Sequence, residues 1–136
     1  YSRAISPGLA INYTTKTQYL FRINKGLLDV WDNVAINKYI PEGEREIPFE
    51  NMIYIGDGST DVPCMKLVKE HGGHSLAVYQ PHSAKKSKAN DLIGENRVNF
   101  VAPANYSPNS RIDEIMKTIL NKISADNELK RIPQKK

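Results

Sequence analysis

The sequence contains a single cysteine, Cys64, among its 136 residues. One cysteine excludes a disulfide within the chain, and no group of Cys and His residues has the spacing of a zinc site. No apolar run approaches the ~18 residues of a membrane-spanning helix, and the first residues lack the basic and then apolar pattern of a signal peptide. We therefore expect a cytoplasmic protein that has no membrane partner.

A large excess of one charge is also absent. The chain has 19 Lys and Arg against 15 Asp and Glu, a net charge of +4, and part of the excess lies in the last residues, LKRIPQKK. The basic run AKKSK at 84–88 is not interleaved with aromatic residues, so we expect no nucleic-acid partner. With 40% hydrophobic and 25% charged residues, the chain suits one globular domain over residues 1–136. Residues 124–136 are predicted to form a flexible basic tail.

Apolar segments that favour β-strands alternate with segments that favour helices. The expected strands are residues 9–13, 52–56, 74–80 and 97–102. The expected helices are a first one that Thr14 or Thr15 caps, then 62–71, 83–93 and 112–123. The segment 52–56 has no polar alternation, which is typical of a buried parallel strand, and the charged segment 41–51 predicts a surface connection. The pattern predicts an α/β fold, a Rossmann-like parallel sheet flanked by helices.

The first helix has two possible ends. Its apolar residues follow helical spacing at Tyr19, Leu20, Ile23 and Leu27. Gly26 either ends this helix or is a weak point in a longer helix that reaches Trp31.

The segment MIYIGDGSTDVPCM, residues 52–65, places two carboxylates four residues apart after an apolar strand. Asp57 follows the strand and Asp61 begins the next helix, so both should lie at the carboxyl edge of the sheet, where such folds bind ligands. Two close carboxylates repel each other, and a hard cation such as Mg²⁺ allows both to stay ionised. Gly56 and Gly58 would let the backbone curl around the ion. The alternative is a plain turn in which Asp57 starts the turn and Asp61 caps the helix.

A calcium loop of the EF-hand kind can be excluded by counting. It would share the spacing of Asp57, Ser59 and Asp61. It requires glycine at the next position, where Val62 stands, and glutamate at its twelfth position, where Val68 stands. It also follows a helix, whereas this loop follows an expected strand.

The sequence YIGDGSTDVPCM resembles the fourth motif of the haloacid-dehalogenase-like (HAD) superfamily, in the form GDGxxDxxM of its phosphoserine-phosphatase-like members. The resemblance spans roughly residues 9–101 and implies an enzyme that hydrolyses a small phosphorylated substrate through a phosphoaspartyl intermediate. It implies that Asp57 binds Mg²⁺ directly and that Asp61 supports the metal. Ser59 and Thr60 would reach metal-bound water or phosphate oxygens.

The family also requires a lysine, at the start of the helix before the motif strand, that neutralises the phosphate. Lys16 and Lys25 are the candidates. A lysine at the helix start shares the carboxyl edge with Asp57, while Lys25 is nine residues, or ~13 Å, further along. The helix dipole stabilises a cation near the helix end, so Lys25 needs no function to explain its place. The same dipole disfavours a cation at the helix start, where Lys16 lies. We therefore expect Lys16 to bind phosphate and to act in catalysis together with Asp61.

Cysteine and histidine side chains are expected to play no part in the chemistry. Cys64 has no histidine placed as its base, so packing is the expected role. His71, at a helix end, and His74 flank a Gly-Gly turn. His82 lies in a loop on the carboxyl edge, where it could approach the site, but a solvated histidine is expected.

The nucleophile of the family is missing from the sequence. It is the first Asp of a DxDx(T/V) motif, and no D-x-D occurs in the chain; Asp29 and Asp32 lie in a helix-like stretch instead. We therefore expect this chain to be the C-terminal portion of a HAD-like core that lacks the nucleophile strand and the cap. Alone, it should be inactive. The first residue agrees with this expectation, because it is Tyr1 and not an initiating Met. The strand edge left open invites self-association.

Two other functions stay open. The chain could be a non-catalytic module that binds Mg²⁺ or a partner with the same fold. It could also be a basic interaction protein whose turn only looks like the motif.

Overall fold

A computed structural model describes residues 13–27, 29, 32–41 and 44–133. These residues form the helices and strands α1 (Tyr13–Lys25), α2 (Asn33–Asn37), β1 (Ile53–Gly56), α3 (Val62–Glu70), β2 (His74–Tyr79), α4 (Lys85–Gly94), β3 (Phe100–Pro103) and α5 (Arg111–Arg131). Short 3₁₀ turns at Phe49–Asn51 and Ser59–Asp61 precede β1 and α3. The predicted strands 74–80 and 97–102 and the predicted helices 62–71 and 83–93 are confirmed, with ends moved by a few residues.

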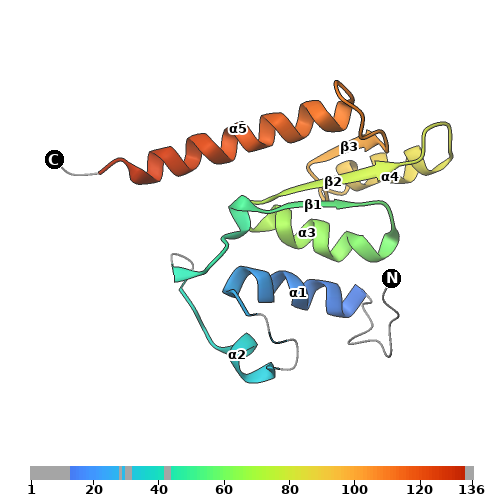
Figure 1. Cartoon of the computed structure of the whole chain (residues 1–136). Coiled ribbons are helices and arrows are strands. Elements are labelled where there is room, and N and C mark those ends of the chain that lie inside the picture. Colours follow the sequence, from blue (N-terminus) through green and yellow to red (C-terminus); the bar gives the residue numbers. More distant parts are fainter. Residues whose placement is uncertain (1–12, 28, 30–31, 42–43, 134–136) are drawn as a thin grey trace, which may run out of the picture.

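The three strands form one parallel sheet in the order β1-β2-β3. In Figure 1, α5 lies on one face of the sheet, α3 lies on the other, and α1 lies beyond α3. The predicted α/β fold, with a small parallel sheet flanked by helices, is therefore confirmed. No helix within the described ranges is long and apolar enough to cross a membrane.

The central strand β2 supplies the core on both sides of the sheet. Leu76 and Val78 point towards α5 and pack with its Ile112, Ile115 and Ile119. Ala77, between them, packs on the opposite face with Met65 of α3 and Ala89 of α4. Side chains alternate across a strand, so a strand with helices on both faces reads as a continuous apolar run.

The predicted parallel strand at residues 52–56 is confirmed as β1, but the prediction that it is buried is wrong for most of its residues. Gly56 is buried, but Ile53 and Tyr54 are half-buried and Ile55 is 36% exposed. The strand pairs with β2 on one side, and no other strand of the described chain pairs with its second edge. An apolar run indicates that both faces of a strand are covered, and here α5 and α3 cover them. It does not indicate whether both edges of the strand are paired.

The first helix differs from its prediction at both ends. Tyr13, expected to end a strand, begins α1, so Thr14 and Thr15 lie in its first turn and are not its cap; residues 9–12 lie outside the described residues. The helix stops at Lys25, because Gly26 adopts a left-handed conformation with φ of 72°, and the longer alternative is wrong.

Polar side chains on α1 hold the connection that follows it, which is an unexpected use of this helix. Ile23, predicted to face the core, is 48% exposed, while Arg22 and Asn24 beside it are buried. Asn24 Nδ2 donates to the Ile47 carbonyl at 2.7 Å and its Oδ1 accepts from Arg45 at 2.9 Å. These contacts satisfy the buried amide and fix the predicted surface connection against α1.

The C-terminal helix is longer than predicted. Ile112, Ile115 and Ile119 are buried as expected, although Leu120 is 54% exposed. The helix continues to Arg131, so residues 124–131 are helical and the prediction of a flexible tail from residue 124 is wrong for them. Pairs one turn apart stabilise this exposed half, such as Lys122 with Asp126 at 2.7 Å.

The unpaired edge of β1 predicts concentration-dependent self-association. Edge strands expose backbone groups that pair with a second chain, and a lysine on such an edge disfavours pairing. The mass measured by light scattering should rise above the 15.4 kDa of one chain as concentration increases, and Ile55→Lys should lower it. Ile93→Lys, at a residue of α4 that is 47% exposed, is the control and should not. A constant mass, or equal effects of the two variants, would contradict the prediction.

Candidate functional site

The candidate site is the loop that joins β1 to α3 at the carboxyl edge of the sheet. Its backbone turns directly behind Gly56, and a Cβ at this position would lie 2.7 Å from the Asp61 side chain. Any larger residue would therefore displace Asp61 from the loop. Gly56 is required because the carboxylate folds back onto the end of the strand.

Asp61 is the centre of the hydrogen bonding in this loop. Its Oδ1 accepts from Lys16 Nζ at 2.9 Å and from Tyr54 Oη at 2.7 Å, and its Oδ2 accepts from the Gly58 N–H at 3.2 Å. Asp61 occupies the N-cap position of α3, but its side chain makes no capping hydrogen bond to that helix. The predicted cap of α3 is therefore corrected: the carboxylate closes the preceding 3₁₀ turn instead.

The surroundings of Asp61 keep it ionised although it is only 8% exposed. Burial raises the pKa of this carboxyl, but the hydrogen bonds from Lys16, Tyr54 and Gly58 outweigh burial and hold the pKa below its ordinary value. Burial, and then the hydrogen bond to Asp61, raise the pKa of Tyr54, so its hydroxyl stays protonated and donates.

Lys16 reaches this loop from α1, 45 residues earlier in the chain. Its Nζ also donates to Thr60 Oγ1 at 3.0 Å, so one ammonium group contacts two consecutive residues of the loop. In Figure 1 the N-terminal end of α1 lies on the same side as the turn from β1 to α3. The structure thus brings together Lys16, Thr60 and Asp61, three of the predicted site residues.

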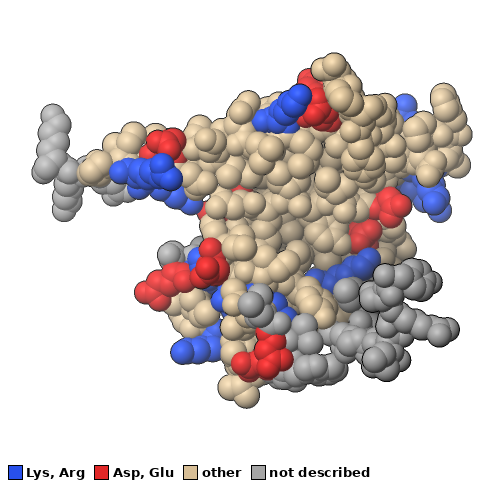
Figure 2. Space-filling view, viewed as in Figure 1, with Lys and Arg blue, Asp and Glu red and all other residues tan. Residues whose placement is uncertain are grey.

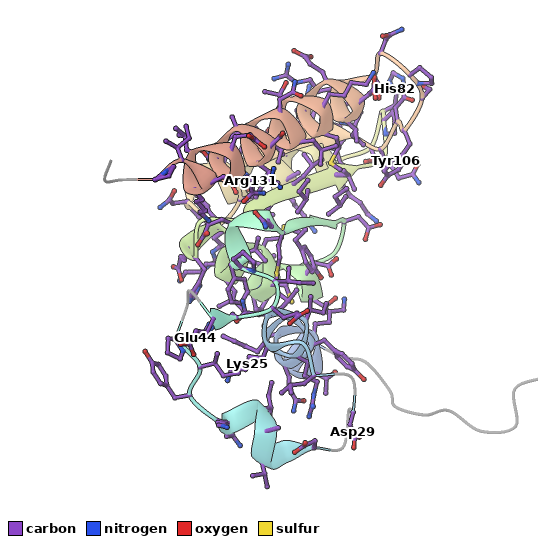
Figure 3. The ribbon with its side chains drawn as sticks, turned by 60° about the vertical axis from the view of Figure 1, so that its left-hand side comes forward. Lys25, Asp29, Glu44, His82, Tyr106 and Arg131 are labelled. Atoms are coloured by element: carbon purple, nitrogen blue, oxygen red, sulfur yellow. The ribbon has the colours of Figure 1, made fainter. Side chains whose placement is uncertain are left out.

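Lys25 has a structural role at the other end of α1. Its Nζ donates to the carbonyls of Ile36 at 2.6 Å and Lys38 at 3.1 Å. Figure 3 shows Lys25 beside the connection that carries Asp29 and Glu44. Of the two candidate lysines, Lys16 is therefore the one at the loop.

Asp57 and Ser59, the remaining predicted site residues, lie exposed in the same loop. Asp57 makes no hydrogen bond or ion pair with any residue that the structure describes, so its carboxylate is free to take a ligand there. In the described part of the chain, no group of three or more His, Cys, Asp or Glu side chains could hold a metal ion. Of the two carboxylates of the loop, Asp61 is hydrogen-bonded on both oxygens, and Asp57 is the one without a partner among the described residues.

The histidine residues make no contact with Asp61, whereas the Cys64 thiol lies beside the Tyr54 hydroxyl. Cys64 is buried, and burial raises the pKa of its thiol, which leaves it unsuited to nucleophilic attack. His71 caps α3 and its Nδ1 lies 2.9 Å from the Leu67 carbonyl, while His74 is buried at the start of β2. The loop with His82 follows the carboxyl end of β2, and Figure 3 shows His82 away from α1.

Tyr54 is the site residue that the sequence reasoning missed. A signal was present, because Tyr54 lies two residues before Gly56 and both therefore face the same side of the strand. That side packs against α3, where Asp61 leads into the helix. A tyrosine at this position can reach a carboxylate at the helix start.

The chain is similar to part of a bacterial protein. No protein-family model matches the chain, and no solved structure matches it. An uncharacterized protein of Borreliella burgdorferi is 37% identical over 105 residues, which is 75% of this chain and 34% of that protein. The chain thus spans about a third of the length of this relative.

The role of Asp61 predicts a loss of stability in acid. A carboxylate with a depressed pKa stabilises the fold above its unfolded pKa, and this contribution is lost as the pH falls through the folded value. Chemical denaturation should therefore show the unfolding free energy falling below about pH 4. Asp61→Asn should cost about 1–3 kcal/mol at neutral pH, because Lys16 and Tyr54 lose an ionised acceptor, and it should flatten the acid dependence.

Asp126→Asn is the matched control, because Asp126 pairs with Lys122 on the exposed half of α5. This variant should change the stability little and keep the acid dependence. The prediction fails if Asp61→Asn retains the full acid dependence.

Proposed function

We propose that this chain is the C-terminal part of a Mg²⁺-dependent phosphatase of the HAD-like superfamily, which hydrolyses a small phosphomonoester in the cytoplasm. The observation that carries the proposal is the contact of Lys16 with the loop after β1, 2.9 Å from Asp61 and 3.0 Å from Thr60. A motif of this kind needs a cation from the preceding helix at this place. The geometry is what a phosphate-binding lysine requires.

The residues of the loop fit a magnesium ion. Mg²⁺ in proteins is commonly bound by one or two carboxylates and keeps several waters, so a full set of protein ligands is not needed. Asp57 is exposed and unpaired among the described residues, which suits direct binding. Asp61 already accepts three hydrogen bonds, which suits a supporting role through water. Bound there, Mg²⁺ would offset the negative charge of the phosphoryl oxygens.

The chain's own groups would bind and orient the phosphate. The Lys16 side chain is 27% exposed, and its contacts with Thr60 and Asp61 use two of the three N–H groups of its ammonium, so the third can donate to a phosphate oxygen without leaving the loop. Ser59 and Thr60 are exposed in the same loop, and their hydroxyls can donate further hydrogen bonds. Tyr54 and the Gly58 N–H keep Asp61 in place while Lys16 exchanges partners.

The attacking aspartate is proposed to come from another part of a longer protein. No D-x-D motif occurs in these residues, and the Borreliella relative is about three times as long as the matching region. In the proposed enzyme this aspartate attacks phosphorus, the alcohol leaves, and water hydrolyses the phosphoaspartate. A strand that carries it would lie beside the open edge of β1, so the isolated chain would be inactive.

Magnesium binding is tested on the chain itself. In ¹H–¹⁵N NMR spectra, Mg²⁺ should shift the amide signals of residues 56–61, and Asp57→Asn should abolish these shifts because it removes the free carboxylate. Asp91→Asn, an exposed aspartate on α4, is the matched control and should leave them unchanged. Shifts that persist in Asp57→Asn would refute the assignment of the metal site, and no shifts at all would favour a module without a metal.

The role of Lys16 is tested by titration with inorganic phosphate in the presence of Mg²⁺. Lys16→Gln should weaken phosphate binding by about tenfold, the loss of one charge-assisted contact. Lys25→Gln should leave phosphate binding intact but lower the stability, because Lys25 holds two backbone carbonyls. Equal phosphate affinity in Lys16→Gln and the unmodified chain would contradict the proposal.

A further inference from the structure

A cleft of about 300 Å³ opens between the starts of α3 and α4, below the carboxyl edge of β1 and β2. Its walls are mainly apolar and include Val62, Met65, Ala77, Ala89 and Leu92. The volume is at the lower end of the range for small-molecule sites. It is large enough for a small organic group and has an apolar surface to hold one.

Two lysines of α4, Lys85 and Lys88, line the cleft. They are three residues apart and therefore lie on the same side of the helix. Both are exposed, and neither ammonium has a hydrogen bond or ion pair within the described part of the chain. The first turn of α4 holds no acidic residue, and a helix dipole disfavours cations in that turn. Two unpaired positive charges beside an apolar wall are complementary to an organic anion.

The loop after β1 contributes to both this cleft and the Lys16 contact. Asp57, Gly58 and Ser59 line the cleft, and the next two residues, Thr60 and Asp61, contact Lys16. Figure 2 shows acidic side chains over the turn from β1 to α3 with basic side chains on both sides of them. Asp57 thus lies at the mouth of the cleft.

We infer that this cleft binds an organic anion that has an apolar portion and a carboxylate. The anionic group contacts Lys85 and Lys88, and the apolar portion lies against Met65, Ala77 and Leu92. A second inference rests on the proposed function. If the chain is part of a phosphatase, the group bound in the cleft is the alcohol part of its substrate. The substrate is then an organic phosphate with a second anionic group, and its phosphoryl group lies at Asp57.

The inference is tested by titrating the ¹⁵N-labelled chain with 2-naphthoate, in EDTA and without phosphate. We expect saturable amide shifts at Gly56, Ala77 and Ala89. The matched probes are 2-naphthalenemethanol, which keeps the apolar portion without the charge, and sulfate, which has charge without an apolar portion. Both should bind more weakly than 2-naphthoate.

The double variant Lys85→Gln/Lys88→Gln should weaken 2-naphthoate binding by about three- to tenfold, as expected for two solvent-accessible ion pairs. Lys86→Gln is the matched control, because Lys86 is exposed on the same turn of α4 and does not line the cleft. It should change the affinity by less than about twofold. Both variants alter exposed side chains, and their amide spectra report directly whether the fold is kept.

Shifts that map to α5 or to the open edge of β1, equal binding of the alcohol, or an equal loss in Lys86→Gln would overturn the inference. The titration needs neither Mg²⁺ nor the Lys16 contact. Absence of 2-naphthoate binding would therefore overturn the cleft assignment and leave the proposed phosphatase standing. If 2-naphthoate binds but Mg²⁺ has no effect at Asp57, the cleft assignment stands and the proposed phosphatase is contradicted.

Discussion

The arrangement of the site depends on the carboxylate of Asp61, which joins three separate parts of the chain. Lys16 comes from α1, Tyr54 from β1 and the Gly58 N–H from the loop between β1 and α3. Because Asp61 is buried, its negative charge is stable only when these donors are present. The position of the start of α1 on α3 is thereby tied to the conformation of the loop.

This interaction also gives the two aspartates of the loop different roles. Asp61 is neutralised by Lys16 and accepts hydrogen bonds on both of its oxygens, whereas Asp57 is exposed and unpaired among the described residues. A cation between the two carboxylates is therefore not needed to offset the charge of Asp61, because Lys16 already offsets it. The free ligand capacity is concentrated in Asp57, and the positive charge that a phosphate would meet is concentrated in Lys16.

Local signals in the sequence predicted well which segments form strands and helices, but not the residues at which these elements begin and end. Alternation of β-prone apolar segments with helical segments was sufficient to predict β2, β3, α3 and α4, and of the two strands only β2 is buried along most of its length. The burial of β1 was overestimated because a sequence pattern does not reveal whether a strand has one neighbour or two. The polar face of α1 was missed because Asn24 and Arg22 are buried through contacts with the distant connection. Within the site, Lys16 was found by comparing its place on the helix with that of Lys25, while Tyr54 was read only as part of an apolar strand.

The position of the site on β1 links its chemistry to its exposure. Ligands of parallel α/β sheets bind where the strands end, and the strand that leads into Asp57 is one of the two edge strands of the described sheet, β3 being the other. A strand added there would end beside Asp57 if it ran parallel to β1, and would bring its own carboxyl-end residues next to the loop. The edge at which we predict self-association is therefore also a place from which further groups could approach the loop. Pairing at this edge would cover Ile55 and enclose Asp57 in the same step, so folding of a longer protein and assembly of its site would be one event.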